Sequence, residues 1–310
     1  MYYMRAEETL ARLAPERDTC LTIGVFDGVH LGHQHLLAQV RELAARDGLL
    51  PGVVTFDRHP RQVLSSGNGV LALTTLDERQ ALLSSQGMPL VVVLPFDRDV
   101  AQLTAQQFCD LLCRYLRLRC LVVGPDFALG RGREGTVPVL QALGLEMGFR
   151  VAPASFFTLE GQIVSSTAIR KALAAGDVAQ AARLLGRPFS LQGIVVRGEE
   201  RGQTLGFPTA NLTVNEHRAL PADGVYVARA ILEGRALPAV SYIGPRPTFG
   251  PGQRVLETYL LDFSGKLYGR ELRVELVDYL RGDVKFDSID ALKEQIARDV
   301  AAARQALDRP

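Results

Sequence analysis

The first half of the chain alternates short, continuously apolar segments with helical patterns. The apolar segments are predicted strands, and their unbroken apolar character indicates burial on both faces, as in a parallel sheet covered by helices. The clearest helical pattern runs from Phe108 to Leu116, with Thr104 and Gln107 spaced as a capping box. We therefore expect an α/β domain around a parallel sheet. Its predicted strands are residues 21–26, 52–56, 90–94, 120–123 and 150–154.

The pattern changes near residue 186. A short helix that Asp177 and Gln180 are expected to cap ends at Leu184-Leu185-Gly186, and Arg187-Pro188 follows it. A chain of 310 residues is also long enough for two domains. We expect the first domain to span residues 1–186 and the second to span 187–310.

Beyond residue 190 the chain consists of strand-like segments joined by Gly, Pro and Asp. Several antiparallel strands at this spacing are typical of a small barrel or sandwich. Glu233-Gly234 and Ser264-Gly265 are predicted hairpin turns. An amphipathic helix is expected over residues 288–307. The predicted strands are residues 191–196, 225–232, 237–243, 255–261 and 271–280.

Composition excludes several classes of protein. With 35 basic and 34 acidic residues, the net charge of +1 leaves no electrostatic footprint for nucleic acid or an anionic membrane. No apolar run approaches the ~20 residues of a membrane-spanning helix. The four cysteines show no disulfide-like spacing, which favours a reduced, cytoplasmic setting. We expect no nucleic-acid or membrane partner, and either a monomer or a weak homo-oligomer.

A turn rich in glycine and histidine, Gly28-Val29-His30-Leu31-Gly32-His33, follows the first predicted strand and precedes a helical pattern that stops at Gly48. Backbone N–H groups at a helix N-terminus attract phosphate, and parallel sheets bind ligands at the carboxyl ends of their strands. The histidines add movable protons or positive charge at that place. The turn therefore predicts a site that handles phosphate.

Two other interpretations of these histidines stay open. They are ordinary surface or core residues, or they form a zinc site together with His35, which is less favoured because His30 and His33 straddle a turn and the cysteines lie in other predicted elements. The phosphate interpretation is favoured because glycines flank the turn and a helix follows it. Asp27, beside the turn, either caps a helix or helps to bind a Mg²⁺–nucleotide complex.

A second helix start carries hydroxyl groups and a cation. Ser165, Ser166 and Thr167 stand at the start of a helical pattern that contains Arg170 and stops at Gly176. Taken alone, such hydroxyl groups are ordinary N-caps. Paired with the histidine turn, they and Arg170 offer donors and a fixed charge for the β- and γ-phosphates of a nucleotide.

The second half contains a glycine-spaced loop that leads from Gly202 and Gly206 into Pro208-Thr209-Ala210-Asn211. This arrangement suits a backbone cradle for phosphates, with hydroxyl and amide oxygens for Mg²⁺. It is not a Walker loop, because no Lys-Ser/Thr pair follows the second glycine. The alternative is an ordinary loop with a serine/threonine-type turn.

Glu257 stands in a strand pattern on the same face as Val255, Tyr259 and Leu261. A carboxylate in such an apolar row lies either on an edge strand, where charges discourage aggregation, or at a functional site. The functional interpretation is a general base, a role that contributes about 10²–10⁴ in rate.

The histidine turn and the Ser-Ser-Thr-x-x-Arg segment resemble the paired signature motifs of nucleotidylyltransferases. Together with Thr55–Pro60 and Val123–Phe127, they resemble the adenylyltransferase half of bacterial bifunctional riboflavin kinase/FAD synthetases. The resemblance implies a Rossmann-like nucleotidylyltransferase domain in which His30 and His33 stabilise charge on the phosphates of ATP. Arg170, Ser166 and Thr167 would hold the leaving pyrophosphate. The implied nucleotide-binding residues are Gly24, Phe26, Asp27, Gly28, Asp126, Ser165, Ser166 and Thr167, and the implied flavin-binding residues are His59 and Phe127.

The second half closely resembles the riboflavin kinase module of the same family. The resemblance implies a six-stranded antiparallel β-barrel that ends in a helix, with Thr209 and Asn211 binding Mg²⁺ and the phosphates of ATP. Glu257 would take the proton from the ribityl 5′-hydroxyl, and Arg281 would lie near the flavin. Gly202, Gly206 and Pro208 would bind the nucleotide. The segments that carry this resemblance are residues 208–211, 221–226, 243–249, 255–261, 267–269 and 280–286.

The implied function is the conversion of riboflavin and ATP to FMN, and then of FMN and ATP to FAD and pyrophosphate. Mg²⁺ is the implied cofactor. Val25, Leu129 and Tyr242 depart from the residues that are usual in the family. The alternatives are an adenylyltransferase for another phosphorylated acceptor, such as phosphopantetheine, and a flavin- or nucleotide-sensing protein with an inactive barrel. A tRNA synthetase is disfavoured, because the chain lacks a lysine-rich second motif and a basic face.

Overall fold

The computed structural model describes residues 4–64, 69–198, 202, 205–245 and 254–308. Backbone contacts divide the chain into two compact units, Met1–Ser165 and Ser166–Pro310. Each unit contains one of the two sheet types that the sequence predicts. This division after Ser165 reflects which elements pack together, and it does not test where one activity ends and the other begins. The boundary between the two activities at residues 186–187 therefore remains a prediction.

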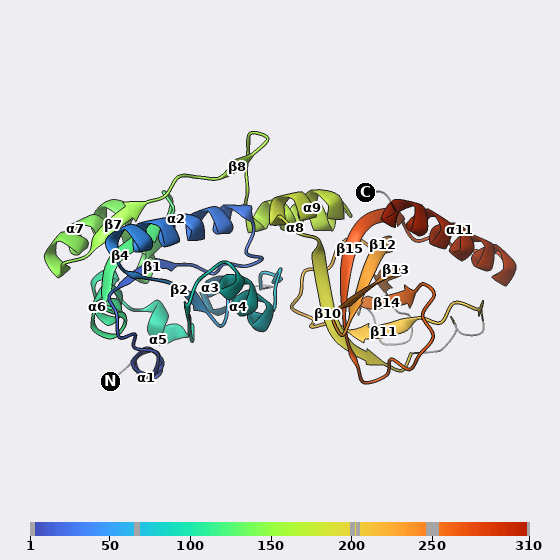
Figure 1. Cartoon of the computed structure of the whole chain (residues 1–310), viewed down its shortest axis with the longest axis horizontal. Coiled ribbons are helices and arrows are strands. Elements are labelled where there is room, and N and C mark those ends of the chain that lie inside the picture. The colour runs from blue at the N-terminus through green and yellow to red at the C-terminus, as the bar shows by residue number, and fades with distance from the viewer. Residues whose placement is uncertain (1–3, 65–68, 199–201, 203–204, 246–253, 309–310) are drawn as a thin grey trace. The chain divides into compact units, whose positions relative to one another are not determined.

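The N-terminal unit is built on a five-stranded parallel sheet, as predicted (Figure 1). Its strand order is β3-β2-β1-β4-β7, so β1 occupies the centre. The central position buries β1 completely. The strands are β1 (Thr19–Ile23), β2 (Leu50–Phe56), β3 (Leu90–Leu94), β4 (Leu118–Val123) and β7 (Arg150–Pro153).

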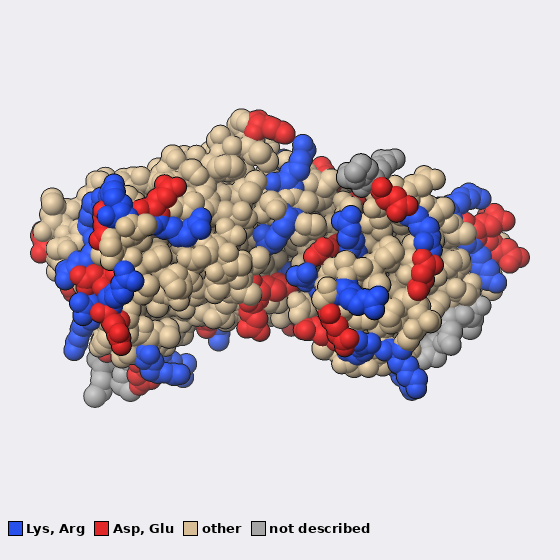
Figure 2. Space-filling model, viewed as in Figure 1, with Lys and Arg blue, Asp and Glu red and all other residues tan. Residues whose placement is uncertain are grey.

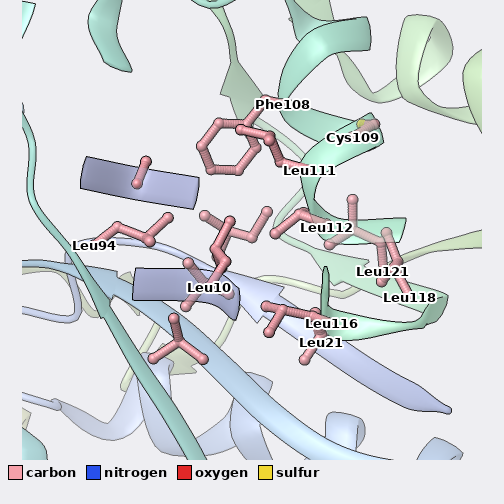
Figure 3. Close-up of a cluster of buried hydrophobic side chains, with 14 of the residues drawn as sticks. Leu10, Leu21, Leu94, Phe108, Cys109, Leu111, Leu112, Leu116, Leu118 and Leu121 are labelled. Carbon is pink, nitrogen blue, oxygen red and sulfur yellow. The ribbon is translucent and has the colours of Figure 1, made fainter. Parts of the chain in front are cut away.

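Helices cover both faces of this sheet. Alternate residues of β1 point to opposite faces, so Leu21 packs with α1, α6 and α7, whereas Cys20 packs with α2 and α4. Figure 3 shows the first of these clusters, in which Leu21 lies near Leu112 and Leu116 of α6. The helices are α1 (Met4–Arg12), α2 (Leu31–Asp47), α3 (Pro60–Leu64), α4 (Leu76–Ser85), α5 (Arg98–Ala101), α6 (Ala105–Leu116) and α7 (Val137–Met147).

Local hydrogen bonds set the helix ends that the sequence predicts. The side chain of Thr104 accepts from the backbone of Gln107, and the Gln107 side chain accepts from the backbone of Thr104, which is the expected capping box. Helix α2 ends at Gly48 in a left-handed conformation. The short elements of this unit are β5 (Ala128–Leu129), the 3₁₀ turn Arg131–Arg133, β6 (Gly135–Thr136), β8 (Thr158–Leu159) and β9 (Gln162–Ile163).

The second unit is a closed antiparallel barrel of six strands, which confirms the predicted architecture. The strands follow one another around the barrel in the order β10-β11-β14-β13-β12-β15. The Ala210–Asn211 part of the glycine loop motif belongs to a strand, β11. The strands are β10 (Phe189–Val196), β11 (Ala210–Thr213), β12 (Gly224–Leu232), β13 (Arg235–Pro245), β14 (Arg254–Leu260) and β15 (Glu271–Arg281).

One of the two predicted hairpins is correct. Leu232 of β12 pairs with Arg235 of β13 across the Glu233-Gly234 turn. The prediction of a hairpin at Ser264-Gly265 is wrong, because β14 and β15 are not neighbours in the barrel. The barrel closes by pairing β15 with β10 and β12, so the segment after β14 crosses to a distant strand instead of turning back.

Helices α8 (Ser166–Ala174), α9 (Val178–Leu185) and α11 (Ile289–Leu307) accompany the barrel. Helix α9 packs against β10 and β15, and α11 packs against β12, β13 and β15. The side chain of Asp177 accepts from the Gln180 backbone at the start of α9, as predicted, and α9 ends at Gly186. Ser288 caps α11 in the same way.

The described part of the chain contains no helix that is long and apolar enough to span a membrane. On the face drawn in Figure 2, basic and acidic side chains are interspersed over both units. This mixture agrees with the nearly equal totals of basic and acidic residues in the sequence.

Candidate functional site

The histidine turn joins the carboxyl end of the central strand β1 to the start of α2. Phe26 and Val29 both adopt left-handed backbone conformations, with φ angles of 52° and 40°, so the turn is tightly constrained. His30 is the N-cap of α2, where its Nδ1 atom accepts from the backbone N–H of His33 at 3.3 Å. In the neutral ring this bond assigns the remaining proton to Nε2.

The rings of His30 and His33 are stacked. Their centroids are 3.6 Å apart and their planes differ by 17°. Phe26 also contacts His33, with a centroid separation of 5.0 Å and ring planes tilted by 59°. His35 is not part of this stack, since its Nε2 atom hydrogen-bonds Ser155 Oγ at 3.2 Å. The residues that the structure describes contain no group of three His, Cys, Asp or Glu that could hold a metal, so the zinc interpretation finds no support.

His33 is kept neutral by its surroundings. Burial lowers the pKa of His33 well below its ordinary value of 6.5, and the neighbouring charges of His30 and Arg79 lower it further. Its Nδ1 atom is buried and makes no hydrogen bond within the described structure. A buried polar atom without a partner is unfavourable, so a hydrogen-bonding ligand at this ring would gain from the contact.

Asp27 does not cap the helix that follows the turn, as one of its two sequence interpretations expected, because His30 is the N-cap of α2. Its buried carboxylate accepts from the backbone N–H groups of Leu73 and Thr74, at 2.9 and 3.1 Å, and from the Thr74 hydroxyl at 3.3 Å. The backbone N–H of Gly28 donates to the same hydroxyl at 3.2 Å. Asp27 thus anchors the segment that precedes α4 to the histidine turn, and its role toward a nucleotide stays a prediction.

Arg79 is a residue of this site that sequence reasoning missed. Its buried guanidinium donates to the carbonyl oxygens of Val25 at 2.8 Å and Phe56 at 2.6 Å, and so ties the carboxyl ends of β1 and β2 together. Burial lowers the pKa of Arg79, while nearby Asp27 and Asp57 oppose that change. The sequence offers one weak signal for this burial. Arg79 stands four residues before Leu83, so both lie on the same face of α4, and Leu83 is buried as well.

Other predicted residues lie in loops at the same edge of the sheet, because parallel strands end together. His59 follows β2, and its Nδ1 atom accepts from the Arg61 backbone at 3.1 Å. Gly124, Asp126 and Phe127 follow β4, with Asp126 exposed and Phe127 packed partly against the core. The structure therefore brings the predicted nucleotide and flavin residues of this unit to one edge, next to Gly24 at the end of β1.

The Ser-Ser-Thr segment begins beside the histidine turn. A Cβ atom on Gly32 would lie 3.1 Å from the Val164 carbonyl oxygen, so only glycine lets residue 164 pass this close to α2. Ser165 follows directly, and Ser166 and Thr167 form the first turn of α8. Helix α8, which carries Arg170, groups with the second unit, and the proposed contact of its side chains with pyrophosphate remains a prediction.

The second site is a cavity of about 570 Å³ between the barrel wall and α11. Its polar lining includes most of the predicted kinase residues. Its apolar lining comes from the glycine loop and the barrel strands as well as from the segment after β15 and from α11. The predicted residues that line it are Gly202, Thr209, Asn211, Glu257 and Arg281, and the apolar residues of the segment after β15 and of α11 are Val284, Phe286, Leu292, Ile296 and Val300.

A single row of the barrel carries the polar groups. Asn211 of β11 pairs directly with Glu257 of β14, Glu257 pairs with Tyr242 of β13, and Tyr242 pairs with Val225 of β12. Val225 in turn pairs with Arg281 of β15. Directly paired residues point to the same face of a sheet, which explains why all five line the cavity. Because β14 lies between two strands of a closed barrel, the edge-strand explanation of Glu257 does not apply.

The glycine loop packs against this row. Gly202 accepts, through its carbonyl, a hydrogen bond of 2.8 Å from the Phe207 backbone, and a side chain at position 202 would collide with the Phe207 carbonyl and crowd Thr209. Gly206 lies in this turn and Pro208 just beyond it, with a left-handed φ of 89° at Gly206. Positions 201, 203, 204 and 246–249 of the predicted motifs lie outside the described residues.

Arg281 lies at the cavity, but its guanidinium is held by α11. It forms a two-pronged ion pair with Asp299, with contacts of 3.1, 3.0 and 2.8 Å, and Gln295 donates to the same carboxylate at 2.8 Å. A further N–H of Arg281 donates to the Gly282 carbonyl. Arg281 therefore joins β15 to α11, and its contact with flavin stays a prediction.

Comparisons with known proteins match both units. A family model for FAD synthetase matches residues 13–168, and a family model for riboflavin kinase matches residues 185–307. The bifunctional riboflavin kinase/FMN adenylyltransferase of Escherichia coli (strain K12) is 42% identical over 294 residues, which cover 94% of each chain. The corresponding protein of Pseudomonas fluorescens is 41% identical over 304 residues, or 97% of each chain.

A solved structure matches the fold of nearly the whole chain. This crystal structure, described as a macrolide-efflux protein from Streptococcus pneumoniae, has a TM-score of 0.89 and 31% sequence identity, and the match covers 97% of each chain. A parallel sheet with a histidine turn and a closed barrel with a lined cavity, each matched by its own family model, define a two-domain class of flavin-nucleotide transferases. The chain belongs to the bifunctional riboflavin kinase/FMN adenylyltransferase family.

Proposed function

We propose that this chain carries out both reactions of its family, each at one of the two sites described above. The family models and the curated relatives support riboflavin kinase and FMN adenylyltransferase activities. The barrel converts riboflavin and ATP to FMN and ADP. The histidine-turn site of the N-terminal unit converts FMN and a second ATP to FAD and pyrophosphate.

The observation that carries the proposal is the register row in the barrel. It places Asn211 opposite Glu257 on the wall of a cavity with a volume of about 570 Å³, inside the segment that the riboflavin kinase model matches. This volume falls within the range of ligand pockets, and the lining combines polar and apolar side chains. Riboflavin likewise combines a hydroxylated ribityl chain with an apolar ring system.

In the kinase reaction we assign Glu257 as the general base. Its carboxylate accepts the proton of the ribityl 5′-hydroxyl while that oxygen forms a bond to the γ-phosphorus of ATP and ADP departs. Glu257 lies on β14, between β11 and β13, so the barrel holds its backbone on both sides. The rigid strand keeps the base in position for a hydroxyl group that enters the cavity.

Thr209 and Asn211 are the residues proposed to hold Mg²⁺ with the phosphates of ATP. Both line the cavity beside Glu257, and their side chains offer the oxygen atoms that Mg²⁺ prefers. The donor set therefore fits this cation. When bound, Mg²⁺ neutralises charge on the phosphates. The chain's own contribution includes the close approach of Gly202 to Phe207 and Thr209, which leaves no room for a side chain at position 202.

In the adenylyltransferase reaction we assign charge stabilisation to His30 and His33. An oxygen of the FMN phosphate bonds to the α-phosphorus of ATP, and the bond to pyrophosphate breaks. No covalent enzyme intermediate is needed, so positioning and electrostatics supply the catalysis. The proton on Nε2 of His30 and the unpaired nitrogen of His33 are suited to phosphate oxygens at the helix N-terminus. Arg170, Ser166 and Thr167 are proposed to hold the departing pyrophosphate.

A reduced, cytoplasmic setting is part of the proposal, and the four free cysteines support it. The decisive experiment incubates the purified chain with riboflavin, ATP and Mg²⁺ and separates the flavins by chromatography over time. FMN should appear first and FAD afterwards. Supplying FMN in place of riboflavin should give FAD directly. Failure to form FMN from riboflavin would remove the kinase assignment, and failure to form FAD from FMN would remove the transferase assignment.

A further inference from the structure

Tyr242 is the middle residue of the register row that lines the cavity, and none of the proposed catalytic steps uses it. It lies between Glu257 and Val225 in the register row, and it lines the cavity with both. Its ring extends along β13 over Gly244, two residues further on the same face. Any side chain at Gly244 would overlap the Tyr242 ring, so the strand is built to accept an aromatic ring at this place.

The Tyr242 hydroxyl connects β13 to the segment that follows β15. It donates a hydrogen bond of 3.0 Å to Oδ2 of Asp283. Burial and the negative charges of Asp283 and Glu257 raise the pKa of Tyr242, so the phenol stays protonated and remains a donor. Hydrogen bonds to an ionised carboxylate are stronger than those between neutral groups.

Asp283 belongs to a short segment, residues 282–286, that forms one wall of the cavity. Val284 and Phe286 of this segment contribute apolar lining. The segment is held at its start by Arg281, which pairs with Asp299 of α11, and the Arg281 guanidinium also lies 5.7 Å from the centre of the Phe286 ring. The bond from Tyr242 to Asp283 fixes the segment on its other side, against β13.

The 282–286 segment and α11 bring apolar side chains to the cavity that Glu257 also lines, together with the charged groups of Asp283 and Asp299. A riboflavin molecule with its 5′-hydroxyl at Glu257 would have its ring system free to contact these apolar side chains. Tyr242 links the two features, since it is paired with Glu257 and bonded to Asp283.

We propose that Tyr242 is a positioning residue for the flavin substrate, which holds the 282–286 segment against β13 through Asp283. The proposal rests on the proposed kinase function. Without the hydrogen bond from Tyr242 to Asp283, the 282–286 segment is less ordered before riboflavin binds. Part of the binding free energy must then be spent on ordering this segment. The principal effect is therefore on riboflavin affinity and on KM, with a smaller effect on kcat.

The test is a double-mutant cycle in the full-length chain with Tyr242→Phe, Asp283→Ala and the pair. The riboflavin Kd is measured by quenching of flavin fluorescence, and KM and kcat are measured for phosphorylation. Each single variant should raise Kd and KM about tenfold, and the double variant should be no worse than either. FAD formation from supplied FMN should not change. Tyr115→Phe, which removes a phenol hydroxyl from α6 of the N-terminal unit, is the control and should leave Kd unchanged.

Two outcomes would overturn the positioning role: a riboflavin Kd for Tyr242→Phe equal to that of the parent chain, or effects of the two single variants that simply add. A parent chain that binds riboflavin but does not phosphorylate it would refute the proposed function instead. Because Kd needs no turnover, the cycle gives a result for Tyr242 in either case.

Discussion

The imidazole rings of His30 and His33 lie face to face, 3.6 Å apart, at the point where the central strand passes into α2. Two cationic imidazolium rings at this distance would repel each other strongly. The stack therefore requires that one ring stay neutral, and burial selects His33. An incoming phosphate changes this balance, because its negative charge favours protonation of the rings.

The first prediction concerns His33→Gln. This variant should lower the rate of FAD formation from FMN about 100-fold, since it removes a donor aimed at charge that develops on the phosphates. Riboflavin phosphorylation should be retained, because the described residues around the kinase cavity all belong to the second unit. Both rates are measured on the same preparation by chromatography of the flavins.

His35→Gln is the matched control for that variant. His35 lies on the same helix but bonds Ser155 instead of joining the stack, so its replacement should leave FAD formation within about threefold of the parent rate. Equal loss of both activities in His33→Gln would contradict the model of two separate sites.

The second prediction concerns the titration of His33. Its lowered pKa means that the folded state binds fewer protons at this ring than the unfolded state, at pH values between the lowered pKa and about 6.5. Stability should therefore rise with pH across this window, and this contribution should be lost as the pH falls below about 6.5. The ring signals of His33, assigned with the His33→Gln variant, are followed by NMR against pH.

The midpoint of His33 should lie clearly below the ordinary histidine value of about 6.5. A midpoint at or above about 6.5 would show that the interior does not disfavour the charged ring, and His33 would then not be the neutral member of the stack.

The fold could be predicted because its signals are local and repeated. The continuous apolar segments around Cys20–Ile23 and Leu90–Leu94 indicated a parallel sheet, and the alternation along β14 placed Glu257 on one face with Val255 and Tyr259. The hairpin at Ser264-Gly265 failed because turn residues are local, whereas the partner of a strand is decided by how the barrel closes.

The parts of the sites that sequence reasoning missed depend on partners far away in the chain. Arg79 bonds Val25 and Phe56, and Asp299 bonds Arg281, so neither burial can be read from the local pattern. A charged residue on a helix is usually exposed, and only the fold shows that these two are enclosed. The row from Asn211 to Arg281 likewise required the register of five strands.

The third prediction concerns Glu257→Gln. The amide keeps the size of the side chain but cannot accept a proton in the same way, so kcat for riboflavin phosphorylation should fall by about 10²–10⁴. FAD formation from FMN should be unchanged. Initial rates with saturating riboflavin and ATP measure the effect.

Glu275→Gln is the control for the third prediction. Glu275 lies on β15, pairs with Arg273 at 3.1 Å and does not line the cavity. Its replacement should leave kcat within about twofold of the parent value. Full kinase turnover in Glu257→Gln would remove Glu257 as the base and leave substrate positioning as its role.

The fourth prediction concerns the buried pair between Arg281 and Asp299. The Asp299 side chain is only 7% exposed and that of Arg281 is 21% exposed, so solvent screens this pair little. Asp299→Ala leaves the guanidinium without its carboxylate and should lower the free energy of unfolding of the barrel by about 3 kcal/mol. Because Arg281 ties α11 to β15, the riboflavin KM should also rise. Urea denaturation measures the first effect, and steady-state kinetics measure the second.

Glu294→Ala removes the exposed partner of Arg298 on the same helix and serves as the control, with no measurable change in either quantity. If Asp299→Ala proved as stable as Glu294→Ala, then the ion pair would contribute nothing to holding α11, and the wall of the cavity formed by that helix would have to be held by apolar packing alone.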